Sequence, residues 1–597
     1  MSSAQPEATI DCALAFANCL MLFGSARTTL DAQHVVIADS RGSSARQPAT
    51  HFKMFAHKDG VSLLQMFRGG DSFGFVAVLD LRDLMTLRIF DGAVAFSIET
   101  AGELVKGTLP VALAPLQEDG DGSALAYLQL AASLDIIDRR LVDFIGRRGG
   151  ADTASPMPGH AIDIAGRSHC GFIVEGWIAN GRSSNLSFLS EDGLVHIAGS
   201  EIIYKARPDV SKHLRAQRLP VSTEDHGVLL NFPHTLATTD SFIVLEDRAN
   251  SLVPLARIKL NFSENRDRLL ELVSYAVGGG KLPRPAQARR FYLPFFAEAK
   301  NAEEFCVNWI KPAHRDVTTS IIVPLFREYR FIFSLLTMQL AFSGKYEWLF
   351  VSDDPVQHQL LTRILERRSN ALRCPTALIT NRFNYGYGAA NNIGASVARG
   401  KTLLFMNSDI WVDSVRSIDQ ATRKMQEGGY QIAGFRLLYE DGTIQHDGIT
   451  FRPSGLMHNL LLADHPGKGT PHDGAAGEMT EVPAVTGAML MIDKDDFLRV
   501  GQFDRAYIKG DFEDADLCLK VRAQGGKVGL YKSNDIYHLE RQSIRLMGED
   551  ASRLALTYLN CITFNERWNR YLTQPQASRR GQTEKLAELR PRKARAG

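Results

Sequence analysis

The chain has 597 residues, too many for one hydrophobic core, and the usual domain size predicts three or four domains. Its content of 45% hydrophobic and 23% charged residues is typical of soluble globular proteins. The formal net charge of +1 argues against a general nucleic-acid binder, because such proteins need a strong excess or stripe of cationic side chains.

Cysteine usage and apolar runs indicate the compartment. Seven cysteines are scattered along the chain without a CxxC pair, which fits a reduced cytoplasmic protein better than a disulfide scaffold or zinc site. The N-terminus lacks the basic and apolar regions of a secretory signal, and no apolar run reaches the roughly 18 residues of a transmembrane helix. We therefore expect a cytoplasmic protein that is soluble or only peripherally bound at the inner membrane.

The first 285 residues carry an internal duplication. FANCLMLFGSA (16–26) is echoed by HCGFIVEGWIA (169–179), roughly 150 residues later. Short alternating segments between Gly, Asp and Asn turns fill each copy, which is typical of a β-sandwich. We predict two tandem β-sandwich-like domains, 1–150 and 151–285. Trp177 is either a sugar-stacking platform or a core residue, and a core residue is expected.

Helices and a linker complete this half. A helical stretch follows each copy, at 127–148 and 265–277. Residues 278–290, GGGKLPRPAQARR, predict a linker, because three glycines and two prolines among basic residues do not favour a regular element.

The pattern changes beyond the linker, because apolar strands now alternate with helical segments. The strands are TSIIVPLF (319–326), EWLFVSDD (347–354), PTALIT (375–380) and TLLFMNSD (402–409), and the helices between them are 330–342, 355–368 and 388–400. This alternation predicts βαβ units with a parallel sheet, in a Rossmann-like α/β domain over residues 300–545.

Acidic residues follow two of these strands. Asp353 and Asp354 follow the second strand and Asp409 the fourth. The carboxyl edge of an open α/β sheet is where ligands bind, although a lone aspartate there is also a common turn or helix cap. The glycine-rich segment GYGAAN, followed by Asp409, also resembles a dinucleotide fingerprint, but Asn391 replaces its third glycine.

Eight motifs in order carry a resemblance to a known family. They are IIVPLFREY, VSDD, NYGYGAANNIG, LLFMNSD, TGAML, GQFD, FEDADLCLK and YHLERQS, and they cover roughly residues 319–543. Together they resemble a family 2 glycosyltransferase with the GT-A fold. GTIQHDG (442–448) further resembles bacterial polysaccharide enzymes, including rhamnosyltransferases.

The resemblance implies roles for the residues at matching positions. Asp514, the second acid of the ED motif, is the implied catalytic base. Asp409, the last acid of a DxD-type motif, and His538 are the implied ligands of Mn²⁺ or Mg²⁺, although Asn407 replaces the first acid. The acid after the second strand, Asp353 or Asp354, is implied to contact the nucleotide base. The implied donor contacts are Pro324, Glu328, Asp353, Asp354, Asn384, Gly386, Asn392, Asn407 and Ser408.

Sugar transfer independently requires such groups. A hard cation held by a carboxylate offsets the charge of a leaving nucleotide diphosphate. A second carboxylate must accept the proton of the attacking hydroxyl, and single displacement then inverts the anomeric carbon. For Asp514 the alternative is a capping box with Asp511 at the helix start, and for His538 it is a structural histidine.

The last third of the chain holds an insertion, a helix and a tail. Residues 452–480 are rich in Gly, His, Asp and Pro and predict a mobile acceptor loop. In the C-terminal segment, 546–597, we expect a helix over 554–572 that ends in NERW, where processive relatives have QxxRW and this chain has Phe564 at the Gln position. The basic tail beyond it is expected to be disordered, with contact to an anionic membrane as the minority hypothesis.

These observations predict an inverting, metal-dependent glycosyltransferase in bacterial surface polysaccharide synthesis. The expected partners are a nucleotide-diphosphate sugar and a saccharide or lipid-linked saccharide acceptor, without nucleic acid. Two alternatives remain open: an NAD(P)-dependent Rossmann oxidoreductase, and a non-catalytic sugar-binding protein on a degenerate transferase fold.

Overall fold

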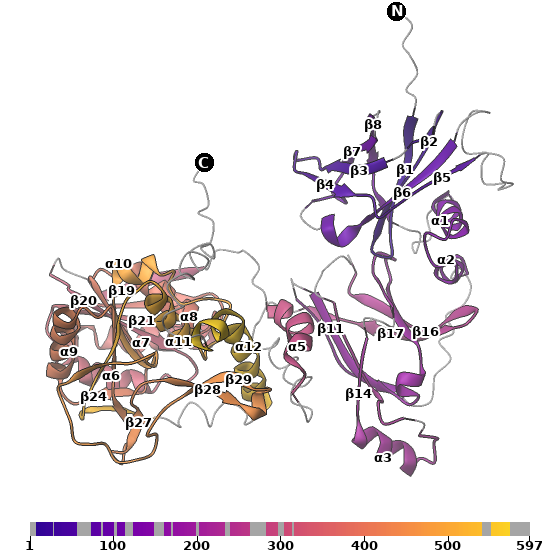
Figure 1. Ribbon diagram of the computed structural model, residues 1–597. Helices are drawn as coiled ribbons and strands as arrows, with labels where there is room; N and C mark the ends of the chain where they lie inside the picture. Colours follow the sequence, from indigo (N-terminus) through magenta and orange to yellow (C-terminus); the bar gives the residue numbers. More distant parts are fainter. Residues whose placement is uncertain are drawn as a thin grey trace, which may run out of the picture. The chain divides into compact units, whose positions relative to one another are not determined.

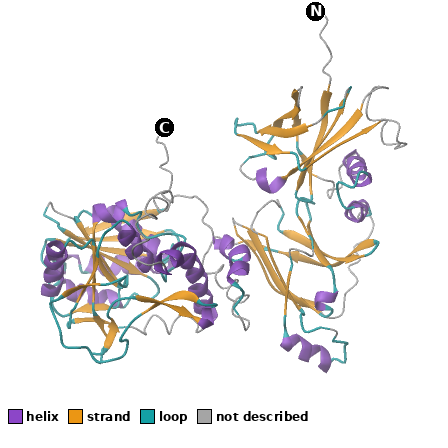
Figure 2. Cartoon of the chain, viewed as in Figure 1, coloured by secondary structure: helices purple, strands orange, loops and turns teal. Residues whose placement is uncertain are grey.

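The computed structural model divides the chain into two compact units, Met1–Ser263 and Glu264–Gly597 (Figure 1). Strands dominate the first unit, whereas helices cover the sheet of the second (Figure 2). The structure describes residues 8–27, 29–30, 32–56, 73–84, 87–100, 104–113, 123–147, 160–168, 171–198, 202–221, 223–232, 239–262, 282–296, 304–312, 316–539 and 551–573. Among these residues, no helix is both long and apolar enough to cross a membrane.

The first half of the first unit contains two antiparallel-rich sheets. The five-stranded sheet has the order β5 (His51–Ala56), β6 (Phe73–Asp80), β2 (Cys19–Ala26), β1 (Ala8–Phe16) and β9 (Ala112–Leu113). The four-stranded sheet has the order β4 (Ser44–Pro48), β3 (Ala32–Ala38), β7 (Ala93–Thr100) and β8 (Leu104–Pro110). The helices α1 (Ser123–Ser133) and α2 (Arg139–Gly146) follow, where the sequence predicted one continuous helical stretch.

The second half repeats the same strand order. Its five-stranded sheet runs β14 (Ile203–Lys205), β15 (Gly227–Phe232), β11 (Gly171–Ile178), β10 (His160–Ser168) and β18 (Asn261–Phe262). Its four-stranded sheet runs β13 (His196–Ile197), β12 (Leu186–Ser190), β16 (Ser241–Arg248) and β17 (Ser251–Lys259). In both copies the first and last strands of the larger sheet pair in parallel. In both copies the first strand has an irregular register, after Ile10 and after Ile162.

Both halves contribute to one hydrophobic cluster, which includes Phe96 and Phe242. Asn18 donates a side-chain hydrogen bond of 2.9 Å to the carbonyl of His196 in the other half. The division into two separate sandwich domains at residue 150 therefore stays a prediction. The helix predicted at 265–277 lies outside the described residues.

Trp177 lies in a small apolar cluster of this unit. Its ring packs edge-on against His213 of α3 (Pro208–Ala216), beside Val210 and Leu214. This environment favours the core interpretation of Trp177 over a sugar platform.

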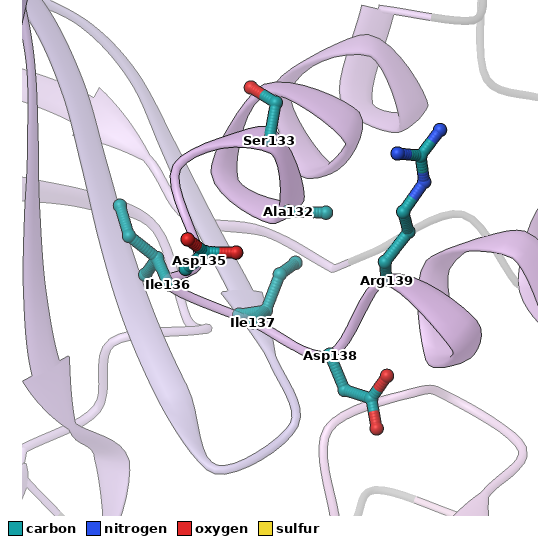
Figure 3. Close-up of a pocket in the computed structure, with 7 residues that line it drawn as sticks. All are labelled: Ala132, Ser133, Asp135, Ile136, Ile137, Asp138 and Arg139. Atoms are coloured by element: carbon teal, nitrogen blue, oxygen red, sulfur yellow. The ribbon is translucent and has the colours of Figure 1, made fainter. Parts of the chain in front are cut away.

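A hollow of about 520 Å³ lies at the turn between α1 and α2 (Figure 3). It is lined by Ala132, Ser133, Asp135, Ile136, Ile137, Asp138 and Arg139. Asp138 caps α2 by accepting a hydrogen bond from the Arg140 N–H, and its carboxylate also pairs with the Arg140 guanidinium. Asp138 therefore has a structural role in the fold.

A nine-stranded mixed sheet organises the second unit. Its order is β19 (Phe305–Lys311), β22 (Thr376–Asn381), β21 (Tyr346–Ser352), β20 (Thr319–Leu325), β23 (Thr402–Met406), β31 (Met489–Asp493), β25 (Ile432–Phe435), β32 (Val528–Tyr531) and β30 (Met479–Glu481). The four strands β22, β21, β20 and β23 are parallel, as the sequence predicted. Their continuous apolar runs are buried because helices cover both faces of the sheet.

The helices that follow β20 belong to this unit. They are α6 (Phe331–Gln339), α7 (His358–Arg367), α8 (Tyr387–Val397), α9 (Val415–Gly428), α10 (Lys494–Arg499), α11 (Glu513–Ala523) and α12 (Ala551–Thr573). A smaller four-stranded sheet has the order β24 (Ile410–Val412), β33 (Ile536–His538), β26 (Leu437–Leu438) and β27 (Ile444–His446). The helices predicted between the parallel strands are confirmed as α6, α7 and α8.

Two sequence predictions about irregular segments are wrong. The predicted linker contains the helix α5 (Pro285–Phe291), because Pro285 occupies the first turn, where its missing N–H costs nothing, and the helix buries Ala288. The predicted irregular loop 452–480 contains β29 (Leu460–Asp464), which pairs with β28 (Thr450–Ser454) in a hairpin.

The helix α12 is part of the core of the second unit. Cys561, Phe564, Trp568 and Tyr571 of α12 lie in the hydrophobic cluster that contains the parallel strands. The C-terminal helix, predicted as a separate segment, therefore packs as an integral element of this unit (Figure 1).

Candidate active site

The carboxylate of Asp409 meets an imidazole just beyond the end of β23. The next strand, β24, pairs antiparallel with β33, so that Ile410 lies opposite His538. This register places His538 Nε2 3.2 Å from Asp409 Oδ1, and each side chain is 10% exposed. The Leu539 N–H also donates to the carbonyl of Asp409 at 2.9 Å. The structure thus brings together the two predicted metal ligands.

This pair of side chains fits a divalent cation. Two adjacent ligand atoms of a six-coordinate ion lie about 3 Å apart when each bond is near 2.1 Å, close to the observed separation. Within the described residues, no group of three or more His, Cys, Asp or Glu side chains converges as a metal site. Asp409 and His538 would supply two ligands of such a cation.

Asn407 and Ser408 form the turn between β23 and Asp409. The Asn407 N–H donates to the carbonyl of Ala488 at 2.8 Å. The side-chain oxygen of Asn407 is buried without a hydrogen-bond partner. Because buried polar atoms are usually satisfied, this oxygen is a candidate ligand contact.

Asp353 shapes the glycine-rich turn. Its carboxylate accepts hydrogen bonds from the Tyr385 N–H (3.0 Å), the Gly386 N–H (2.8 Å) and the Asn381 amide (2.8 Å). Gly386 has a φ of +89°, and a Cβ there would lie 2.6 Å from the Lys509 Cα. Glycine is required at this position both by conformation and by the close approach of the backbone.

Tyr387 connects this turn to the ED motif. Its hydroxyl donates to the carbonyl of Gly487 at 2.6 Å, and the N–H of Gly487 donates to Asp514 Oδ2 at 2.7 Å. Since the next residue, Ala488, accepts from Asn407, two consecutive residues link both ends of the site. The carboxyl end of β23 and the start of α11 are therefore held by one segment.

Asp514 is half-buried at the start of α11. Its Oδ1 accepts from the Ala515 N–H at 2.7 Å. Burial raises the pKa of the Asp514 carboxyl, although the N–H groups of Gly487 and Ala515 oppose this shift. Burial, followed by the charge of Asp514, raises the pKa of Glu513 well above its ordinary value. A carboxylate with a raised pKa is a stronger base than a solvated one.

The capping-box alternative for Asp514 is wrong. The N-cap of α11 is Phe512, which is left-handed and makes no side-chain cap bond. Asp511, the expected capping partner, instead accepts a hydrogen bond of 2.7 Å from the Thr557 hydroxyl of α12. The carboxylate of Asp514 accepts from Gly487, outside its own helix, and from the adjacent Ala515 N–H.

The remaining predicted donor residues are Asp354, Asn384, Pro324 and Glu328. Asp354 caps the short helix 355–357 through the Val356 N–H, and Asn384 accepts from the Gly386 N–H at 3.1 Å. Pro324 lies inside β20, and Glu328 pairs with Arg330.

Asn392 is corrected to a structural residue. It is 5% exposed, and its amide exchanges two hydrogen bonds with the Phe503 backbone. Its amide therefore serves the fold, through the backbone of Phe503.

Sequence reasoning missed a buried histidine next to the site. His446, in the GTIQHDG motif, accepts at Nε2 from the N–H groups of Gly448 (3.3 Å) and Thr486 (3.2 Å). Its proton must therefore be on Nδ1, which donates to His465 Nδ1 at 2.9 Å. Burial, followed by His465, holds the pKa of His446 well below its ordinary value. The motif was visible in the sequence, but nothing local indicated a pairing with His465.

Sequence reasoning also missed a buried acidic centre in α11. Asp516 is fully buried and accepts from Arg567 and Trp568 of α12, both at 2.7 Å. The RW pair of NERW thus contacts a carboxylate of the protein itself.

Comparisons with known proteins identify the central part of the chain. Residues 320–499, less than half of the chain, match the family described as Glycosyl transferase family 2. A segment of 201 residues is 29% identical to "Uncharacterized protein y4gI" of Sinorhizobium fredii and covers 34% of this chain and 22% of that protein. A segment of 162 residues is 28% identical to "O-antigen biosynthesis protein RfbC" of Myxococcus xanthus and covers 27% of this chain and 12% of that protein. The chain thus spans less than a quarter of the length of these relatives.

Solved structures with partial similarity include two glycosyltransferase complexes. GalNAc-T7 with UDP, GalNAc and Mn²⁺ has a TM-score of 0.33 at 14% identity, covering 46% of this chain and 54% of that chain. The mannosyltransferase PcManGT from Pyrobaculum calidifontis, in complex with GDP-Man and Mn²⁺, has a TM-score of 0.28 at 11% identity, covering 54% and 86%.

Proposed function

We propose that the second unit transfers a sugar from a nucleotide-diphosphate sugar to an acceptor hydroxyl, a proposal that the match of residues 320–499 to Glycosyl transferase family 2 supports. One observation carries this proposal: Gly487 and Ala488 hold Asp514 on one side and the turn of Asn407 to Asp409 on the other. A base and a candidate metal ligand are thereby fixed to one segment.

The donor binds along the carboxyl ends of the parallel strands. Both carboxylate oxygens of Asp353 accept hydrogen bonds from its own surroundings, so this residue acts by shaping the glycine-rich turn. The half-buried Asp354 and Asn384 beside it are the better candidates to contact the nucleotide base. The unpartnered oxygen of Asn407, with Ser408, is placed to contact the sugar diphosphate.

Asp409 and His538 would hold Mn²⁺ or Mg²⁺. When bound, such a cation offsets the charge that develops on the leaving diphosphate. Asp409 contributes a negative charge to its binding, and the β24–β33 pairing fixes the orientation of both side chains. Because a nitrogen ligand suits the softer ion, this donor set favours Mn²⁺ over Mg²⁺.

Asp514 is the proposed general base. The acceptor oxygen attacks the anomeric carbon while the bond from that carbon to the diphosphate oxygen breaks. The hydroxyl proton passes to the Asp514 carboxylate, and the nucleoside diphosphate leaves. Attack from the face opposite the leaving group inverts the configuration at the anomeric carbon. The hydrogen bond from Gly487 keeps one carboxylate oxygen in place.

The acceptor is proposed to be a saccharide or lipid-linked saccharide of a bacterial surface polysaccharide. The similarity to an O-antigen biosynthesis protein supports this class. The hairpin β28–β29 and the segment up to β30 are the proposed acceptor-binding insertion.

Two alternatives are less well supported. In an NAD(P)-dependent oxidoreductase, the glycine-turn amides would bind pyrophosphate, but here the Gly386 N–H donates to Asp353. In addition, β31 runs antiparallel to β23, unlike the parallel sheet of that fold. A sugar-binding protein without catalysis differs from the proposed enzyme only in the role of Asp514.

The test first identifies a donor and then removes the base. Thermal shifts against nucleotide sugars and dinucleotides, with and without Mn²⁺, select the donor. With that donor, Asp514→Asn should lower turnover by roughly a hundred- to ten-thousandfold while the donor Kd changes less than about twofold. The matched control, Glu513→Gln, should keep turnover within about tenfold. Parental turnover by Asp514→Asn would refute the role of Asp514 as the base, whereas donor binding without any turnover in the parent itself would leave sugar binding without catalysis.

A further inference from the structure

The loop that precedes Asp514 has a strained backbone. Lys509, Asp511 and Phe512 have φ values of +58°, +80° and +73°, a left-handed conformation that non-glycine residues rarely adopt. Three such residues within four positions persist only where neighbouring groups fix the loop. The element that fixes residues 508–512 therefore also determines where the following carboxylate lies.

The helix α12 provides several of these constraints, beside the Tyr387 N–H, which donates to the carbonyl of Lys509. Asn560, fully buried, accepts at Oδ1 from the Ile508 N–H (2.8 Å) and donates through Nδ2 to the carbonyls of Ile508 (3.0 Å) and Gly510 (2.6 Å). Thr557 binds Asp511, and the Phe564 ring lies 5.2 Å from that of Phe512. One face of α12 thus contacts the strained loop at several successive residues.

The same helix also holds the residue just beyond Asp514. Arg567 and Trp568 donate to the buried carboxylate of Asp516. The helix therefore contacts the chain on both sides of Asp514, in the loop before it and at Asp516 after it. Figure 1 shows α12 beside α11 and β29.

We propose that α12 is the positioning element of the active site and that Asn560 is its main positioning residue. By fixing the strained loop 508–512, Asn560 keeps the Asp514 carboxylate on the Gly487 N–H and in reach of the acceptor hydroxyl. The proposal rests on the proposed role of Asp514 as the base. A displacement of about 1 Å at a reacting group can cost a hundredfold in rate, so loss of this clamp should act on turnover.

The chain contains a matched control for this role. Asn565, on the same helix and 6% exposed, accepts from the Leu461 N–H (2.8 Å) and donates to the Leu461 carbonyl (2.9 Å). It makes the same kind of backbone clamp as Asn560, but on β29 of the insertion. A purely structural role of α12 would make the two residues equivalent in their effect on turnover.

The experiment compares variants of the full chain. Asn560→Ala, Asn565→Ala and Asp514→Asn are measured for melting temperature, for the Kd of the selected donor's nucleoside diphosphate with Mn²⁺, and for turnover. Asn560→Ala should lower turnover ten- to a hundredfold with the Kd within about twofold. Asn565→Ala should lower the melting temperature by a similar amount and, because β29 belongs to the proposed acceptor insertion, raise the acceptor KM, while turnover at saturating acceptor stays within about threefold.

Two further variants cover the case in which Asn560→Ala does not fold. Asn560→Asp keeps the shape and the acceptor atom but places an oxygen against two carbonyls, so turnover should fall at least as far. Thr557→Val removes only the exposed contact to Asp511 and should lower turnover about three- to tenfold.

The outcomes separate the two proposals. If Asp514→Asn retains parental turnover, Asp514 is not the base, and the positioning role, which rests on it, fails as well; a parent without any turnover refutes the proposed function itself. Suppose instead that Asp514→Asn is inactive. Equal losses of turnover in the Asn560 and Asn565 variants would then refute only the positioning role of α12. Parental turnover in the Asn560 and Thr557 variants would have the same meaning.

Discussion

Replacing Arg567 by methionine should destabilise the second unit through the buried carboxylate of Asp516. This carboxylate has three hydrogen-bond donors, Arg567 and Trp568 at 2.7 Å and the Tyr507 hydroxyl at 3.2 Å, and the Lys520 ammonium lies 2.8 Å from its other oxygen. Removing one partner of a buried ion pair typically costs 3–5 kcal/mol. Because Lys520 remains as a counter-charge, we expect about 3 kcal/mol, near the lower limit.

A double-mutant cycle with Asp516→Asn isolates this pair. Arg567 also binds Asp504 at 2.6 Å, so the single variant loses more than one contact. If the buried carboxylate is the main cause, the double variant should be about 1–3 kcal/mol more stable than the sum of the two single effects.

The assay must report on the second unit alone. Hydrogen exchange of the amides in α11 and α12 does so, because these amides exchange when the second unit opens and not when the β-rich unit opens. A cost below about 1 kcal/mol for Arg567→Met, or additive effects in the cycle, would show that Asp516 does not depend on α12.

Three further predictions concern the site itself. Asp409→Asn should abolish the Mn²⁺ dependence of nucleoside-diphosphate binding measured by calorimetry; unchanged dependence would exclude Asp409 as a ligand. Burial raises the pKa of Glu513, so its contribution to stability is full below its unfolded pKa and is lost as pH rises through its folded pKa. Glu513→Gln should therefore melt higher than the parent at pH 7, with a difference that shrinks on acidification; a difference independent of pH contradicts this. Gly386→Ala should cost at least about 2 kcal/mol more than Gly429→Ala, because both residues have positive φ but only Gly386 meets backbone atoms within 4 Å. Equal melting temperatures for the two variants would show that the glycine-rich turn can accommodate a Cβ at position 386.

The sequence predicted the parallel strands and the acids at their ends because both signals are local. An uninterrupted apolar run such as Leu403–Met406 can only be buried on both faces, and an acid directly after it must lie at the carboxyl edge of the sheet. The helices between these strands could be predicted because the spacing of apolar residues changes there from that of a strand to that of a helix. For the same reason the glycine-rich turn was recognisable, although its donors bind Asp353 and not a pyrophosphate.

Pairings between distant residues could not be predicted. Asp516 and Arg567 are separated by 51 residues, and Asp353 and Gly386 by 33. Periodicity shows which face of an element is apolar, but not which buried polar groups satisfy one another. The capping box at Asp514 failed for this reason, since Asp511 has a better partner in Thr557 than in its own helix. The linker prediction failed because Pro285 starts a helix, α5, that lies against α12, a neighbour far away in the sequence.

The short segment Thr486–Ala488 explains why distant motifs must occur together. Its three residues contact His446, Asp514 and Asn407 through backbone groups alone. Such contacts place no demand on side-chain identity except at Gly487, where a Cβ would lie 3.0 Å from the Tyr387 hydroxyl and 3.3 Å from the Asp514 Cβ. A larger residue there would push apart the glycine-rich turn and the ED motif. The geometry that couples Asp409 to Asp514 therefore depends on the absence of a side chain, at a position where neither composition nor periodicity gives a signal.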